Sequence, residues 1–94
     1  MDPHFKVELL AGAAKEFESL PRPEKRRVGE AIDSLERDPR PTGSIKLRGH
    51  SGFRLRVGRQ RVLYQVDDAA QRVLIVRIGP RKDVYRRLER ILRR

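Results

Sequence analysis

The 94-residue sequence predicts an α+β fold. We expect a small antiparallel β-sheet of about four strands, with an N-terminal helical hairpin packed on one face and a short C-terminal helix. The apolar residues change from alternating to helical spacing after the first few residues, and they return to alternation near residue 53. The later strands are separated by short turns, which favours an antiparallel meander. At this length, residues 1–94 are expected to form a single domain with one modest core.

The N-terminal part predicts one strand and two helices. Residues 4–9 alternate apolar and polar side chains, as a half-buried strand does. Residues 11–20 place apolar side chains at helical spacing, and the prolines that follow end this helix. Residues 22–37 form the second predicted helix, whose apolar residues lie on one face. That face consists of Val28, Ile32 and Leu35. The two apolar stripes are expected to cover one face of the sheet.

A hairpin follows a short extended piece at residues 45–49. Residues 53–57 and 61–66 alternate on either side of a turn at residues 58–60. If both apolar rows face one core, three arginines share the opposite face. They are Arg54, Arg56 and Arg61. Like charges gain nothing from packing together, so the simplest explanation for the cluster is an anionic ligand.

The last strand leads into a basic C-terminal segment. Residues 72–79 are nearly all apolar, which predicts a central strand covered on both faces. Pro80 begins the next segment, and apolar residues at helical spacing over residues 84–92 predict a short helix. Arg81 and Tyr85 are expected where this segment meets the sheet face left open and positive. There, Arg81 could reach a bound phosphate and Tyr85 could stack on a base.

Composition narrows the class of partner. The chain has 23 Lys and Arg against 13 Asp and Glu, a net charge of +10 and a pI near 11.2. Such an excess favours RNA, DNA, anionic lipid or an acidic protein. Most of the positive residues are arginine, which binds phosphate in a fork and stacks on bases, so nucleic acid is favoured. The chain contains no cysteine, no bilayer-length apolar run and no secretory signal, so we expect a cytoplasmic protein without a membrane partner.

Few kinds of catalysis suit these residues. His4 and His50 have no partner at a telling spacing, the acidic residues do not cluster, and there is no glycine-rich phosphate loop. We therefore expect no cofactor and no metal. Basic side chains can promote cleavage of RNA by its own 2′-hydroxyl, because the substrate supplies the nucleophile and arginines align and neutralise the phosphate. A domain that binds RNA with the same arginines, without cleaving it, is the alternative.

Four stretches resemble the RelE/ParE superfamily of bacterial toxins. They are KLRG at 46–49, FRLRVG at 53–58, RVLYQV at 61–66 and IGPRKDVY at 78–85. The resemblance covers nearly the whole chain and implies the RelE-like fold. It also implies an mRNA interferase that cuts mRNA in the ribosomal A site. A cognate acidic, RelB-like antitoxin would hold it inactive, and the toxin would reach operator DNA only through that antitoxin.

The resemblance also implies roles for five residues. Arg56 and Arg61 would stabilise the transition-state phosphate, and Arg81 would assist the leaving group. Tyr85 would orient the substrate base or stack on it. Arg54 stands where the best-known members carry a lysine proposed as general base. An arginine stays protonated at ordinary pH, so here it is suited to positioning the phosphate.

Two other interpretations within the same fold stay open. One is a ParE-like toxin that binds and poisons DNA gyrase without chemistry of its own. The ParE branch usually lacks the full set of basic residues plus tyrosine, and this chain has the set. The other is a catalytically weak member that serves only to bind RNA or the antitoxin.

Overall fold

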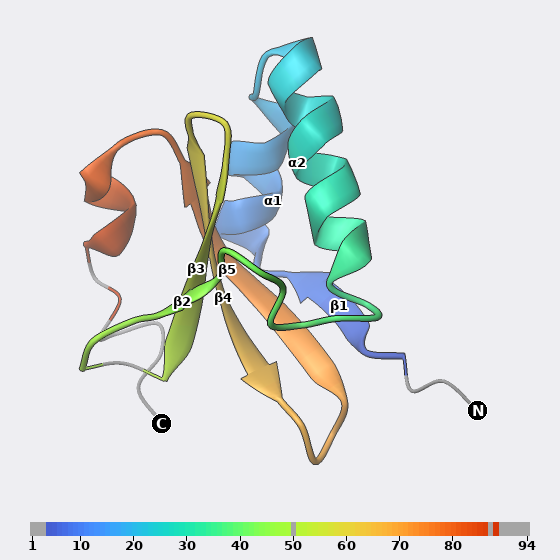
Figure 1. Cartoon of the computed structure of the whole chain (residues 1–94). Coiled ribbons are helices and arrows are strands. Elements are labelled where there is room, and N and C mark those ends of the chain that lie inside the picture. Colours follow the sequence, from blue (N-terminus) through green and yellow to red (C-terminus); the bar gives the residue numbers. More distant parts are fainter. Residues whose placement is uncertain (1–3, 50, 87, 89–94) are drawn as a thin grey trace.

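The computed structural model describes residues 4–49, 51–86 and 88. In chain order its elements are β1 (Lys6–Leu9), α1 (Ala11–Glu18), α2 (Arg22–Ser34), β2 (Ile45–Lys46), β3 (Gly52–Val57), β4 (Gln60–Asp67), β5 (Arg72–Gly79) and the 3₁₀ turn η1 (Lys82–Tyr85). Figure 1 shows the sheet lying between the two α-helices on one side and η1 on the other. No helix in the described part of the chain is long and apolar enough to span a bilayer.

The strands form one sheet in the order β1-β5-β4-β3-β2. The pairs β2–β3, β3–β4 and β4–β5 are antiparallel, whereas β1 at the edge is parallel to β5. The predicted α+β class and the helical hairpin on one face are confirmed. Two features differ from the prediction: the described residues form five strands rather than about four, and the sheet is mixed rather than wholly antiparallel because β1 is parallel to β5. The additional strand is β2, where two residues of the short extended piece pair with the edge of β3.

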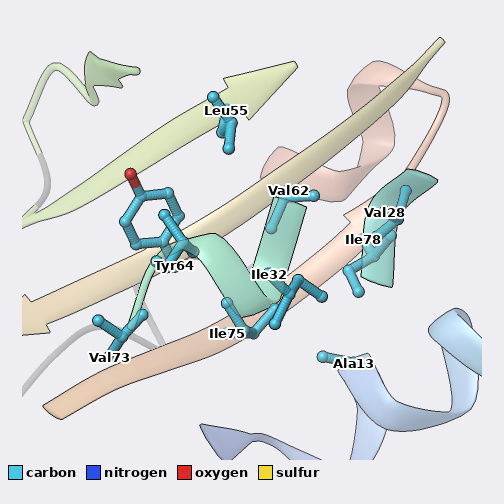
Figure 2. Packing of buried hydrophobic residues seen from close by; sticks show 10 residues of the cluster. Ala13, Val28, Ile32, Leu55, Val62, Tyr64, Val73, Ile75 and Ile78 are labelled. Carbon is cyan, nitrogen blue, oxygen red and sulfur yellow. The ribbon is translucent and has the colours of Figure 1, made fainter. Parts of the chain in front are cut away.

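The main core lies between the sheet and the helical pair. Figure 2 shows its buried side chains converging from α1, α2 and the central strands. The buried members are Ala13, Val28, Ile32, Leu35, Leu55, Val62, Tyr64, Val73, Ile75 and Ile78. Tyr64 of β4 lies in this core and is fully buried. Its hydroxyl donates a hydrogen bond of 2.8 Å to the carbonyl of Pro39, so the buried polar group is satisfied.

The other face of the sheet, here called the second face, carries a smaller apolar cluster of Leu63, Val76, Val84 and Leu88. Val84 and Leu88 belong to the C-terminal segment, which covers this part of the sheet (Figure 1). The prediction that the second face is left open is therefore wrong over this part. Leu63 and Val76 project there, and covering them removes apolar surface from water. Gly79 permits the close approach, since a Cβ at that position would lie 2.7 Å from Cγ1 of Val84.

All three predicted helices differ in extent from those observed. α1 ends at Glu18 rather than at residue 20. α2 ends at Ser34 rather than at residue 37, and the amides of residues 35–37 then bond to carbonyls three residues back. Pro39 disfavours helical backbone at Asp38, so a helix could not continue past that residue. The predicted C-terminal helix begins as a 3₁₀ turn, η1. Its further part, at residues 87 and 89–94, lies outside the described residues.

Candidate functional site

Three arginines of the β3–β4 hairpin project from the second face. Arg56 lies directly opposite Arg61 in the strand register, and Arg54 lies opposite Leu63. Direct cross-strand partners point to the same face, with Cβ atoms about 5 Å apart. Gly58, at the turn, has a positive φ of 63°. This is the conformation that a two-residue hairpin turn requires at its first position. The glycine turn therefore sets a register that brings three positive charges together.

Partial burial separates Arg54 and Arg61 from the exposed arginines of the surface. Among the described arginines only Arg54, Arg61 and Arg77 are half-buried, and the others are exposed. Arg77 has a carboxylate partner, with Glu16 Oε2 at 3.1 Å from its Nη2. Arg54 and Arg61 have no carboxylate within 4.0 Å in the described ranges, and the buried Nε of Arg54 has no hydrogen-bond partner there. A partly desolvated guanidinium without a counter-ion is costly, and a bound anion would lower that cost.

The segment after β5 adds Tyr85 and Arg81 to this cluster. Nη1 of Arg54 donates a long hydrogen bond of 3.5 Å to the hydroxyl of Tyr85. Nη1 of Arg61 donates to the carbonyl oxygen of Pro80, which places the start of this segment against β4. Arg81 follows directly, and its side chain is exposed, as is that of Arg56. Tyr85 itself is half-buried against the second-face cluster.

The five predicted residues therefore come from three segments that meet at the second face. The contacts bring Arg54 to Tyr85, and the register brings Arg56 to Arg61. Arg81 is connected to them through the backbone next to Pro80 rather than by a side-chain contact. We call these residues the basic cluster: Arg54, Arg56, Arg61, Arg81 and Tyr85. Such an arrangement can hold a phosphodiester between several donors, with the phenol as its one neutral hydroxyl.

A β-bulge adds a fourth arginine to the same face. Leu63 pairs with Arg77 and Tyr64 pairs with Ile75, so β5 has one extra residue between these pairs. A bulge of this kind lets two successive residues share a face. Val76 packs in the second-face cluster, and Arg77 beside it reaches Glu16. Strict alternation would have placed Arg77 with Ile75 on the core face, so the strand pattern alone does not reveal this residue.

An exposed ion pair and a buried phenol have shifted pKa values. Hydrogen bonding to Arg40 holds the pKa of the Asp68 carboxyl below its ordinary value, and the same bond raises the pKa of Arg40. Burial raises the pKa of the Tyr64 phenol. Within the part of the chain that the structure describes, no three His, Cys, Asp or Glu side chains lie close enough to hold a metal ion. The basic cluster instead presents several guanidinium donors, which suit an anion.

Comparison with known proteins identifies the family. A family model described as the ParE toxin of the type II toxin-antitoxin system parDE matches residues 7–85. Toxin RelG of Mycobacterium tuberculosis is 34% identical over 85 residues, which cover 88% of this chain and 98% of RelG.

Solved structures of similar chains agree. The archaeal RelE–RelB complex from Pyrococcus horikoshii contains a chain with a TM-score of 0.75 and 32% identity, covering 84% of this chain and 97% of that one. The RelBE2 toxin–antitoxin complex of Mycobacterium tuberculosis gives a TM-score of 0.74 and 29% identity, covering 85% of this chain and 94% of that one. The family match over most of the sequence and the shared fold lead to one conclusion: this chain belongs to the RelE/ParE superfamily and is a toxin of a type II toxin–antitoxin system.

Proposed function

We propose that this toxin is an mRNA endoribonuclease that acts on the ribosome in the cytoplasm and needs no metal ion. We propose further that residues 1–94 form a single toxin domain and that a cognate antitoxin holds it inactive. One observation carries the enzymatic part. Arg54 and Arg61 are half-buried without a carboxylate partner in the described ranges, while the similarly buried Arg77 has one. An RNA phosphate would supply the missing negative charge.

The proposed reaction uses the substrate's own nucleophile. The ribose 2′-hydroxyl loses its proton as its oxygen attacks the adjacent phosphorus, and the bond to the 5′-oxygen breaks. The leaving 5′-oxygen gains a proton, so the products are a 2′,3′-cyclic phosphate and a 5′-hydroxyl. Arg56 and Arg61 face each other across the hairpin and would neutralise the phosphorane oxygens. Arg54 would position the phosphate, and Arg81 would stabilise the leaving 5′-oxygen. Tyr85 would orient the neighbouring base or stack on it.

The antitoxin proposal rests on charge and on relatives. Two of the similar chains were solved in complexes, namely the RelBE2 toxin–antitoxin complex and the RelE–RelB complex. A chain with a net charge of +10 favours an acidic partner. We expect an acidic antitoxin that is partly disordered until it binds. Contact with operator DNA would then be made by the antitoxin and not by the toxin.

A translation assay tests the enzymatic proposal. Purified protein is added to translating ribosomes, and the 5′ ends of the mRNA fragments are mapped by primer extension. We expect cuts within codons, and we expect Arg61→Ala and Arg81→Ala to remove them while circular dichroism shows an unchanged fold. Arg22→Ala, an exposed arginine at the start of α2, is the matched control and should cut like the wild type. Equal cutting by all of these variants would refute the assignment of the basic cluster.

A second candidate function follows from the family match, whose description names the ParE toxin. In that case the protein would bind DNA gyrase and inhibit supercoiling without cutting RNA. Intact mRNA together with inhibited supercoiling would favour gyrase. The affinity for ribosomes gives an independent measure. Each phosphate contact releases counter-ions, so the binding constant should fall with roughly the first power of the salt concentration for each contact. The affinity should therefore fall steeply between about 50 and 200 mM salt. An affinity that salt leaves unchanged would contradict binding through the basic cluster.

A further inference from the structure

A network of polar contacts connects α1, β5 and the segment that carries Tyr85. Nε of Arg77 donates to Glu16 Oε2 at 3.1 Å, and Nη2 of Arg77 lies 3.1 Å from the same oxygen. Nη1 of Arg77 donates to the carbonyl of Arg86 at 3.4 Å. Both side chains are largely shielded, with 23% of Arg77 and 29% of Glu16 exposed. One guanidinium therefore contacts a helix and the C-terminal segment at once.

Glu16 is held in place by the backbone of β5. β1 pairs with β5 only as far as Leu9 and Ile75, so no strand among the described residues borders the outer edge of β5 beyond that point. Oε1 of Glu16 accepts a hydrogen bond of 2.8 Å from the amide of Ile78 at this edge. The same carboxylate thus satisfies an edge amide and neutralises Arg77. Its position relative to β5 is determined by two different bonds.

Arg77 differs from the other arginines of the second face because a carboxylate neutralises its charge. Its charge is balanced by Glu16, whereas Arg54 and Arg61 have no carboxylate within 4.0 Å in the described ranges. An additional phosphate would have to compete with a shielded ion pair, and breaking such a pair leaves an uncompensated charge. Arg77 is therefore poorly suited to binding substrate, although it lies on the same face as the basic cluster.

The contact to Arg86 falls directly after Tyr85. Val84, on the other side of Tyr85, is buried in the second-face cluster. The backbone of Tyr85 is thus held between a buried side chain and a hydrogen-bonded carbonyl. The Tyr85 hydroxyl is 3.5 Å from Arg54, a distance at which small shifts of the backbone decide whether the two groups interact.

We propose that Arg77 is a positioning residue: supported by Glu16, it holds the carbonyl of Arg86 and thereby keeps Tyr85 against Arg54. The consequence for RNA cleavage rests on the proposed function, whereas the consequence for Tyr85 does not. Arg77 acts through the peptide backbone and does not contact the reacting phosphate. A displacement of about 1 Å in a group that orients substrate can cost up to roughly a hundredfold in rate.

The experiment observes Tyr85 directly. The chain has two tyrosines, so ¹³C labelling of the tyrosine rings gives two sets of NMR signals. Tyr85→Phe assigns them. Arg77→Lys keeps a charge for Glu16, but a single ammonium cannot replace the fork that also reaches the Arg86 carbonyl. The double variant Glu16→Gln with Arg77→Met removes both charges and retains an acceptor for the edge amide.

We expect both variants to shift and broaden the Tyr85 signals while the Tyr64 signals stay unchanged. Arg72→Met, an exposed arginine of the same strand, is the control and should leave Tyr85 as in the wild type. In the cleavage assay, kcat should fall about tenfold or more at unchanged KM and unchanged salt dependence.

Two results would overturn the proposal. One is a wild-type Tyr85 signal in both variants. The other is a raised KM with a shallower salt dependence at constant kcat, which would make Arg77 a substrate contact. If the wild-type protein does not cut mRNA, the proposed function fails, and the NMR signals still decide whether Arg77 positions Tyr85.

Discussion

Replacing Arg56 by glutamine should make the fold more stable and the toxin less active. Arg56 and Arg61 are direct partners across the β3–β4 hairpin. Arg56 is exposed and has no carboxylate within 4.0 Å among the residues that the structure describes. The substitution therefore removes a repulsion without breaking an ion pair or leaving a cavity. If the basic cluster binds an anion, the repulsion among its arginines should lower the free energy of unfolding of the free protein by a measurable amount.

The expected magnitude follows from the register. Two like charges about 6 Å apart repel by about 0.7 kcal/mol at the dielectric constant of water and by about 3 kcal/mol at an effective value of 20. Arg56 is exposed, so its repulsion with Arg61 lies near the lower figure, and we expect about 0.5–1 kcal/mol. For a chain of 94 residues, this corresponds to a rise in Tm of roughly 3–6 °C.

Urea denaturation measures the change in the free energy of unfolding. Arg56→Lys keeps the charge and should match the wild type, which separates charge from side-chain length. Arg40→Gln provides a control of opposite sign, because Nη2 of Arg40 lies 2.7 Å from Oδ2 of Asp68 and the loss of this ion pair should not stabilise the protein. Added salt should reduce the difference between Arg56→Gln and the wild type, because salt screens exposed charges. An Arg56→Gln protein no more stable than Arg56→Lys would refute the reasoning.

Two further predictions concern packing and pH. Gly79→Ala should destabilise the fold by about 1–3 kcal/mol, because the new Cβ would lie 2.7 Å from Cγ1 of Val84. Gly12→Ala is the control: its new Cβ would meet no atom within 4 Å apart from its chain neighbours and its own helix backbone, so it should not destabilise the fold in the same urea titration. The Asp68 carboxyl should titrate below its ordinary pKa of 3.8 because Arg40 bonds to its charged form. The contribution of this pair to stability is therefore complete above that pH and is lost as the pH falls through the lower folded-state value. In Arg40→Gln, a carboxyl NMR titration should show that the pKa of Asp68 has risen toward 3.8. A pKa of Asp68 that is the same as in the wild type would show that Arg40 does not lower it.

The sequence by itself determined the features that depend on neighbouring residues. Alternation in two short segments around Gly58 is enough to place Arg54, Arg56 and Arg61 on one face, because side-chain direction in a strand repeats every two residues. Helical spacing similarly predicts α1 and α2. The net positive charge, which points to an anionic partner, is also a property of composition alone.

Only the tertiary structure decided the features that depend on contacts between distant segments. The bulge opposite Leu63 turns Arg77 to the second face, and no local pattern in β5 indicates it. Glu16 meets Arg77 because β1 stops short and α1 continues beside the uncovered edge of β5. The apolar spacing after Gly79 predicts that this segment packs against another part of the protein. Which surface it covers depends on the strands whose apolar side chains point away from the main core, here Leu63 and Val76. Those are long-range relations, and they determine how Tyr85 meets Arg54 from 31 residues away.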